Sequence, residues 1–356
     1  MRILATTDVH GHPLPQKIGK ADILIDAGDF FIGSPLTTFY NTTMEISPLV
    51  KTANDIGYDV MIPGNHDFDH GLDFLLRQAK ELKAAYVCAN ITDLQGNPIF
   101  EPYTIIKRKK MKVGIIGLMT SLLPTLLPYE ISKGFKCLDA QEALQSYLPE
   151  LRKTCDLVIA VYHGGLESDL LTGAPTQYHT GEDEAYKLAG NSQLDGLICG
   201  HQHRVNAGAV GSCLLVQPGS KGQFAGELRY GKKKRQAKIR LLKAESEPNP
   251  EFDDWIKKPI DLSRFPEYLK TITPAISVMS FKGNTIQDFM DSFQAPYNIL
   301  EYRLSDEEIE GIVELPPNPE GHHIVTNQKT FPPYRLQKQY VTNIFDEYLK
   351  YITPKR

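Results

Sequence analysis

Long apolar runs are missing from this chain, which excludes the simplest kind of membrane protein. No stretch approaches the roughly 18–20 apolar residues that a spanning helix needs, because the apolar runs are only strand-sized. The N-terminal residues MRILATTDVH also lack the apolar core of a signal peptide. We therefore expect no membrane partner and a cytoplasmic location, or an extracytoplasmic one if a leader has been removed.

Cysteine is scarce and charge of one sign is not in excess. The five cysteines are odd in number and form no CxxC pair, which argues against a disulfide framework and favours reduced, buried thiols. The net charge of −4 gives no reason to expect nucleic acid as the main partner. The basic run at 232–235 has no interleaved aromatic residues, so it is more typical of a solvated hairpin tip than of a nucleic-acid patch.

Strand-like and helical segments alternate up to about residue 245, as in a layered α/β domain. Helical periodicity is present at 72–84 and 140–154, and 226–242 is typical of a hairpin with Gly231 near its turn. The apolar runs that we interpret as strands are 2–7, 21–27, 59–63, 84–89, 112–118, 156–162, 194–199 and 212–217.

The composition changes after residue 245, which indicates a domain boundary. Residues 246–265 are polar, contain proline and hold the only tryptophan, as a linker would. Residues 266–356 are too few for a large second core. We expect a catalytic domain at 1–245, a linker at 246–265, and a small, abbreviated α+β domain at 266–356.

Five of the predicted strands end in residues that can bind a metal ion, usually beside a glycine. In layered α/β proteins ligands gather at the carboxyl ends of the strands, because the loops converge there. Carboxylates, imidazoles and an amide oxygen, with no thiolate, suit Mn, Zn, Fe or Co. The strand-end residues are Asp8, His10, Asp29, Asn65, His163, His201 and His203.

Seven ligands are too many for one ion with an open position and about right for two. Asp29 is the best candidate to bridge two ions, because it is the lone ligand on its strand. A single strand-end aspartate is more often a helix cap or a turn residue. Clustered histidines, as in Gly-Asn-His-Asp and Gly-His-Gln-His, give a strand end no structural benefit. The pattern therefore predicts a pair of divalent ions, which suits displacement at phosphorus.

In this order, the motifs resemble those of the calcineurin-like metallophosphoesterases: D-x-H, G-D, G-N-H-D/E, a later H, and G-H-x-H. Within that family the chain is most similar to the 5′-nucleotidase and 2′,3′-cyclic-nucleotide phosphodiesterase branch. The resemblance covers about residues 1–245 and implies a four-layer α/β/β/α sandwich with metals at one sheet edge. The stretches that carry it are TTDVHGH (6–12), GNHDFDHG (64–71), residues 163–189, ICGHQHR (198–204) and QPGSKG (217–222).

The resemblance also implies a role for each residue. Asp8, His10 and His203 would hold the first metal, and Asn65, His163 and His201 the second, with Asp29 shared. His66 would face the leaving group, oriented by Asp69, while a metal-bound hydroxide attacks in line. The alternatives are a structural histidine on a turn for His66 and a helix cap for Asp69.

The C-terminal segment resembles only part of the second domain of that branch. Residues 285–315 match its helix, aromatic-proline-aromatic, strand and helix, and 339–349 its closing strand, but its middle is missing. Phe293 and Tyr297 are candidate base-stacking residues, with packing against the linker as the alternative, and Asn65 is a further candidate substrate contact.

The sequence thus predicts a metal-dependent hydrolase of nucleotides, a 5′-nucleotidase or a cyclic-nucleotide phosphodiesterase or both. A non-nucleotide small phosphoester or a nucleotide sugar as substrate is the alternative on the same site. A non-catalytic scaffold of the same fold is a third hypothesis, although no ligand is missing from the motifs.

Overall fold

The computed structural model divides the chain into two compact units, Met1–Glu247 and Pro248–Arg356. The residues that it describes are 1–191, 193–232, 235–244, 248–259, 285–291, 298–309, 322–326 and 336–343.

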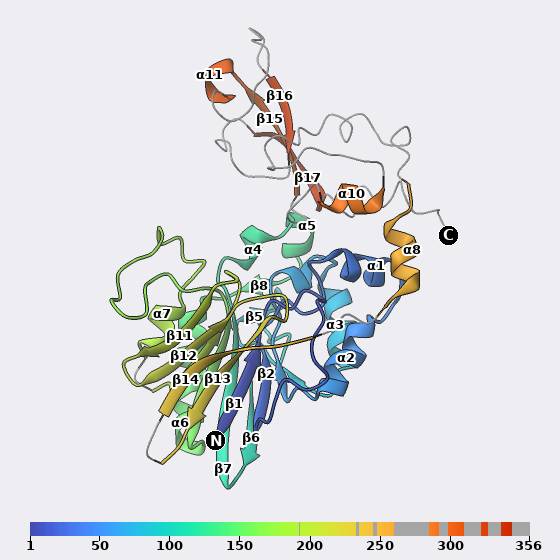
Figure 1. Cartoon of the computed structure of the whole chain (residues 1–356). Helices are drawn as coiled ribbons and strands as arrows, with labels where there is room; N and C mark the ends of the chain where they lie inside the picture. Colours follow the sequence, from blue (N-terminus) through green and yellow to red (C-terminus); the bar gives the residue numbers. More distant parts are fainter. Residues whose placement is uncertain are drawn as a thin grey trace. The chain divides into compact units, whose positions relative to one another are not determined.

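Two six-stranded sheets form the centre of the first unit (Figure 1). The first sheet has the order β14 (Arg235–Leu241), β13 (Phe224–Tyr230), β1 (Arg2–Thr6), β2 (Ile23–Asp26), β3 (Val60–Met61) and β4 (Ala85–Tyr86). The second has the order β11 (Val205–Val210), β12 (Cys213–Pro218), β10 (Gly196–Cys199), β9 (Leu157–His163), β7 (Met111–Met119) and β6 (Tyr103–Arg108). Strands β1 to β4 are parallel, as are β7, β9, β10 and β12. A short antiparallel pair, β5 (Ile91–Thr92) and β8 (Lys136–Cys137), lies outside these two sheets.

The two sheets pack face to face through alternate residues of their strands. Ile3 and Ile25 of the first sheet share one apolar cluster with Ile159 and Val216 of the second. Leu4, between two inward-facing residues of β1, points to the opposite face and joins a different cluster. Side chains alternate across a strand, so β1 is buried on both faces, as an interior parallel strand is expected to be.

Helices cover the outer face of each sheet. The cluster on the first sheet includes residues of α1 (Pro35–Thr43) and α2 (Pro48–Ile56), and that on the second includes α6 (Ala140–Thr154) and α7 (Ala185–Ala189). A further cluster joins α3 (Leu72–Lys80), the 3₁₀ turn η1 (His66–Phe68), α4 (Leu123–Leu126) and α5 (Tyr129–Ser132). This arrangement confirms the predicted four-layer α/β/β/α fold.

Helix ends are fixed by the local sequence. Ser34 and Ser47 cap α1 and α2, each followed by a proline at the first helical position, where its missing N–H costs nothing. No described helix has both the length and the apolar composition needed to cross a bilayer. All five cysteines are free, and Cys88, Cys199 and Cys213 are buried.

The second unit contains a three-stranded antiparallel sheet, β16 (His322–Thr326), β15 (Asn298–Leu304) and β17 (Leu336–Asn343). The helices among its described residues are α8 (Pro250–Ile256), α10 (Ile286–Asp291) and α11 (Asp306–Ile309). Helix α8 lies inside the predicted linker, capped by Asn249 and with Trp255 buried, so that segment is partly helical. The predicted order helix, strand, helix corresponds to α10, β15 and α11. Phe293 and Tyr297 lie outside the described residues.

Candidate metal centre and active site

The loops that follow the strands hold an unusual concentration of left-handed backbone. Eight described non-glycine residues have a positive φ. Five of them are predicted ligands, namely Asp8, His10, Asp29, His201 and His203. This conformation costs non-glycine residues free energy, although less for Asp than for most. Such residues cluster where a site needs side chains in fixed positions.

Glycines in the motifs let these loops approach one another closely. A Cβ on Gly64 would lie 2.1 Å from Oδ1 of Asp29, and one on Gly28 would lie 2.6 Å from Nδ1 of His163. Both distances are far below van der Waals contact. Packing therefore requires glycine at Gly28 and Gly64, which directly precede Asp29 and Asn65, and the positive φ of Gly28 requires it again.

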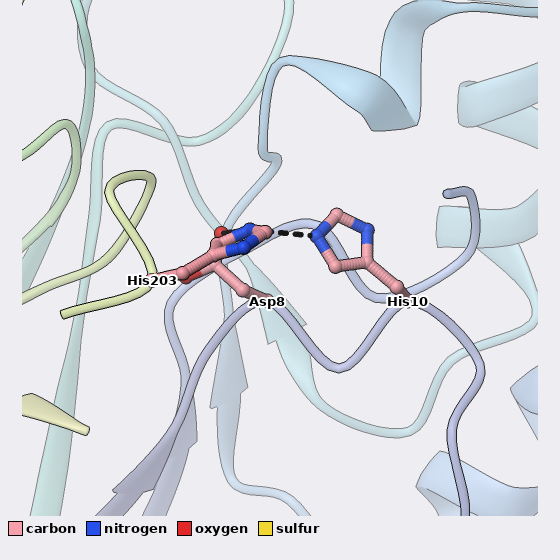
Figure 2. Close-up of side chains that lie close together, drawn as sticks. All are labelled: Asp8, His10 and His203. Carbon is pink, nitrogen blue, oxygen red and sulfur yellow. Dashed lines mark hydrogen bonds and ion pairs between the residues drawn. The ribbon is translucent and has the colours of Figure 1, made fainter. Parts of the chain in front are cut away.

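Asp8, His10 and His203 form the first group of donor atoms (Figure 2). Nε2 of His10 lies 3.1 Å from Nε2 of His203, which lies 3.4 Å from Oδ1 of Asp8. Nδ1 of His10 lies 2.6 Å from the carbonyl oxygen of Ile32, to which it donates. That contact leaves the Nε2 lone pair facing the centre of the group, as in a metal-binding histidine. Burial lowers the pKa of His10 and favours the neutral ring that a ligand requires.

Asp29, Asn65, His163 and His201 form the second group. Oδ2 of Asp29 lies 3.3 Å from Nε2 of His163, whose Nδ1 donates to the carbonyl of Ala27 at 2.7 Å. Oδ1 of Asn65 lies 3.1 Å from Nε2 of His163 and 2.8 Å from Nδ1 of His201. Burial opposes the charged form of His163, but Asp29 outweighs it and raises the pKa to about 10. A cation would therefore compete with a proton for Nε2.

The two groups meet at Asp29. Its Oδ2 lies 3.9 Å from Nε2 of His10 in the first group and 3.3 Å from Nε2 of His163 in the second. This is the position that a shared carboxylate would need. Asp8 also reaches both sides, since one of its oxygens lies within 4.8 Å of donor atoms of Asp29 and His163.

His66 and Asp69 form a hydrogen-bonded pair beside the ligands. Nδ1 of His66 lies 2.9 Å from Oδ2 of Asp69, and the backbone N–H of His66 donates to Oδ1 of Asp29 at 2.8 Å. Helix α3 begins after Gly71 without a side-chain cap, so the helix-cap alternative for Asp69 is wrong. Burial lowers the pKa of His66, but Asp69 and Asp29 outweigh it and raise the pKa to about 9. Nearby cations would lower it again by repulsion.

Comparison with known proteins agrees with this geometry. The family model described as calcineurin-like phosphoesterase matches residues 1–205. The chain belongs to this family. The predicted resemblance is thereby confirmed for the first unit.

Several curated relatives of this family member are named as nucleotide phosphoesterases. A 2′,3′-cyclic-nucleotide 2′-phosphodiesterase/3′-nucleotidase of Yersinia enterocolitica is 27% identical over 312 residues, covering 72% of the chain and 47% of the relative. A 5′-nucleotidase of Vibrio cholerae is 33% identical over 150 residues, covering 41% of the chain and 26% of the relative. The chain thus spans about half the length of the first relative, and less of the second.

Solved structures share the fold of this family member. A Staphylococcus aureus protein crystallised with α-ketoglutarate superposes with a TM-score of 0.72 at 21% identity, covering 99% of the chain and 92% of that protein. The calcineurin-like phosphoesterase YfkN of Bacillus subtilis superposes with a TM-score of 0.57 at 22% identity, covering 71% of the chain and 94% of YfkN.

Two acidic residues of this phosphoesterase family member contact the site, although the sequence motifs predict no role for them. Asp67 is buried and accepts hydrogen bonds from the backbone N–H groups of Asp29 (3.0 Å), Phe31 (2.9 Å) and Gly64 (2.9 Å). It therefore ties the loop after β2 to the loop after β3. Oε1 of Glu182 lies 2.7 Å from Nε2 of His201. The loop that contains Glu182 is polar and shows no periodicity that would indicate this contact.

Proposed function

We propose that this chain is a two-metal phosphoesterase that hydrolyses nucleotides, as a 5′-nucleotidase, a 2′,3′-cyclic-nucleotide phosphodiesterase or both. One observation carries the proposal: the predicted ligands form a continuous series in which neighbouring donor atoms are at most 3.9 Å apart. The order of the series is Asp8, His203, His10, Asp29, His163, Asn65, His201. The names of the curated relatives support nucleotides as the substrate class.

The donor set fits a pair of divalent cations. Asp8, His10 and His203 would hold one, and Asn65, His163 and His201 the other, with Asp29 between them. Carboxylate, imidazole and amide donors without thiolate suit Mn, Zn, Fe or Co. Two such cations supply activation of water and neutralisation of charge on the phosphoryl group.

The remaining residues prepare the site for the substrate. Asp69 holds Nδ1 of His66, so Nε2 is the nitrogen that can donate to a phosphoryl or leaving-group oxygen. Asp67 fixes the loops that present Asp29 and Asn65. Fixed donors of this kind stabilise developing charge without reorganising during the reaction.

Phosphate release by metal-stripped protein tests the proposal. The protein is re-supplied with Mn, Zn, Co, Mg or no metal and offered 5′-AMP, 2′,3′-cyclic AMP, UDP-glucose or bis-p-nitrophenyl phosphate. We expect metal-dependent hydrolysis of a nucleotide, and we expect Asp29→Asn to lower it strongly. Preference for UDP-glucose would indicate that the substrate is a nucleotide sugar. Absence of turnover with every metal and substrate would contradict the proposed activity.

A further inference from the structure

His201 differs from two other histidines of the centre in the partner of its outer ring nitrogen. His10 and His163 each donate to a neutral backbone carbonyl, that of Ile32 and that of Ala27. Nε2 of His201 instead faces a carboxylate, Oε1 of Glu182, at 2.7 Å. Its Nδ1 lies 2.8 Å from Oδ1 of Asn65, so the opposite edge of the ring faces the second group of ligands.

Glu182 is held in place by contacts that do not involve His201. Its carbonyl oxygen accepts hydrogen bonds from the hydroxyls of Thr120 (2.6 Å) and Tyr162 (3.0 Å), which are both buried. The next residue, Asp183, is buried and accepts a hydrogen bond from Nε2 of Gln202 at 2.8 Å. The backbone that presents the Glu182 carboxylate is therefore held at the Glu182 carbonyl and at the next residue.

Gln202 links this segment to the histidines themselves. It lies between His201 and His203 in the sequence, and its side chain accepts from the N–H of Leu166 at 2.9 Å and donates to the Leu166 carbonyl at 3.1 Å. Leu166 follows His163 closely along the chain. The ligand loops and the Glu182 segment thus form one hydrogen-bonded assembly, in which the His201–Glu182 contact is the direct link to a ligand.

We propose that Glu182 is a positioning residue for His201, whose Nε2–H donates to the carboxylate so that Nδ1 points at the cation shared with Asn65. This inference rests on the proposed function. A carboxylate partner fixes the tautomer and the ring orientation and makes the coordinating nitrogen more basic. Loss of such a partner typically lowers metal affinity on the order of 10–100-fold.

Cobalt binding to metal-stripped protein tests the inference without relying on turnover. Co²⁺ is titrated into wild-type protein, Glu182→Ala and Glu182→Gln, and binding is followed by visible absorption and by competition with a chelator. Glu184→Gln is the matched control, because Glu184 lies in the same segment but pairs with Lys187. Thermal unfolding of the metal-free proteins is measured in parallel.

We expect Glu182→Ala to weaken one cobalt site on the order of 10–100-fold, with an altered absorption spectrum and little change at the other site. Glu182→Gln should lie between wild type and Glu182→Ala, because its amide oxygen can still accept from Nε2–H but carries no charge. Glu184→Gln should match wild type, and the metal-free unfolding temperatures should agree.

Three results would overturn the inference. Wild-type affinity at both sites in Glu182→Ala would show that His201 needs no help from this carboxylate. Equal weakening of both sites together with a lower metal-free unfolding temperature would assign Glu182 a general structural role. Failure of the wild-type protein to bind cobalt at all would overturn the proposed function as well, whereas the first two results would leave that function standing.

Discussion

Two regions of the first unit bury acidic side chains in opposite ways. Glu227 on β13 is 1% exposed and pairs with Arg2, Arg229 and Arg240. At the carboxyl ends of the strands, Asp8 and Asp29 are equally buried, but they contact imidazoles and backbone N–H groups and repel one another. The charge of Glu227 is compensated by arginines, which stay protonated, whereas Asp8 and Asp29 contact groups without a permanent positive charge.

The difference separates residues that serve the fold from residues that serve the site. Around Glu227, each charge has a partner of opposite sign, and none of the three arginines has a positive φ. Around Asp29, burial opposes the negative charge, but imidazoles hold it and lower the pKa of the carboxyl, while the left-handed backbone of the same loops raises the free energy of the folded chain. A bound cation would offset that cost, so the second region is organised for a ligand rather than for stability.

The largest effect that we predict is on catalysis, from Asp29→Asn. The amide keeps the size of the side chain but removes the charge shared by the two ligand groups. We expect hydrolysis to fall on the order of 10³-fold, or ~4 kcal/mol of transition-state stabilisation, measured as kcat/KM with saturating metal. Metal-free stability should change less than activity, because Asp8 loses a repelling neighbour while His163 and His66 lose the carboxylate that raises their pKa values. If this variant kept wild-type activity, Asp29 would not be part of the catalytic site.

Glu227→Gln should produce the reverse result. Removing the carboxylate leaves Arg2, Arg229 and Arg240 without their buried anion, and breaking a buried ion pair costs about 3–5 kcal/mol. Because Arg229 and Arg240 are about half exposed, we expect the lower end, about 3 kcal/mol, in urea unfolding followed by circular dichroism. Activity of the folded variant should equal that of wild type. A loss of activity at full metal occupancy would contradict the division between the two regions.

The site was predictable from the sequence to the extent that each ligand directly follows an apolar strand. Contacts between distant segments were not predictable in this way. Asp67 accepts hydrogen bonds mainly from the backbone N–H groups of residues that precede it by 36–38 positions. Glu182 precedes His201 by 19 residues and lies in a polar loop. Neither local propensity nor periodicity reports on pairs of that kind.

The elements that the sequence analysis missed have weak or short apolar patterns. Strand β6 forms a sheet edge and has no buried residue, and β11, at the opposite edge of the same sheet, consists mainly of small residues whose exposure alternates. Helices α1 and α2 have nine residues each, too few for a clear period. Their Ser-Pro beginnings are the signal that would have found them.

Metal addition should stabilise the region around Asp29 and leave the region around Glu227 unaffected. A ligand at 100 times its dissociation constant adds about 2.7 kcal/mol to folded-state stability. For a unit of this size we expect the melting temperature of metal-stripped protein to rise by roughly 5–10 °C. Differential scanning calorimetry should show the same rise in Glu227→Gln and a smaller one in Asp29→Asn. An equal rise in all three proteins would place the stabilising cation away from Asp29.

The smallest effect that we predict is a loss of folding stability that occurs only at acidic pH. Burial opposes the charged form of Glu227, but Arg229, Arg240 and Arg2 outweigh it and lower the pKa below the ordinary value of 4.5. A carboxyl whose pKa is lower in the folded chain contributes its full stability above the unfolded value and loses it as the pH falls through the folded value. Metal-free wild type should therefore lose more stability than Glu227→Gln below about pH 4.5, while the difference between them stays constant from pH 6 to 8. Urea midpoints measured across this range check the prediction. Parallel curves down to pH 3 would mean that the arginines do not hold the Glu227 charge, and the contrast with Asp29 would then rest on backbone conformation alone.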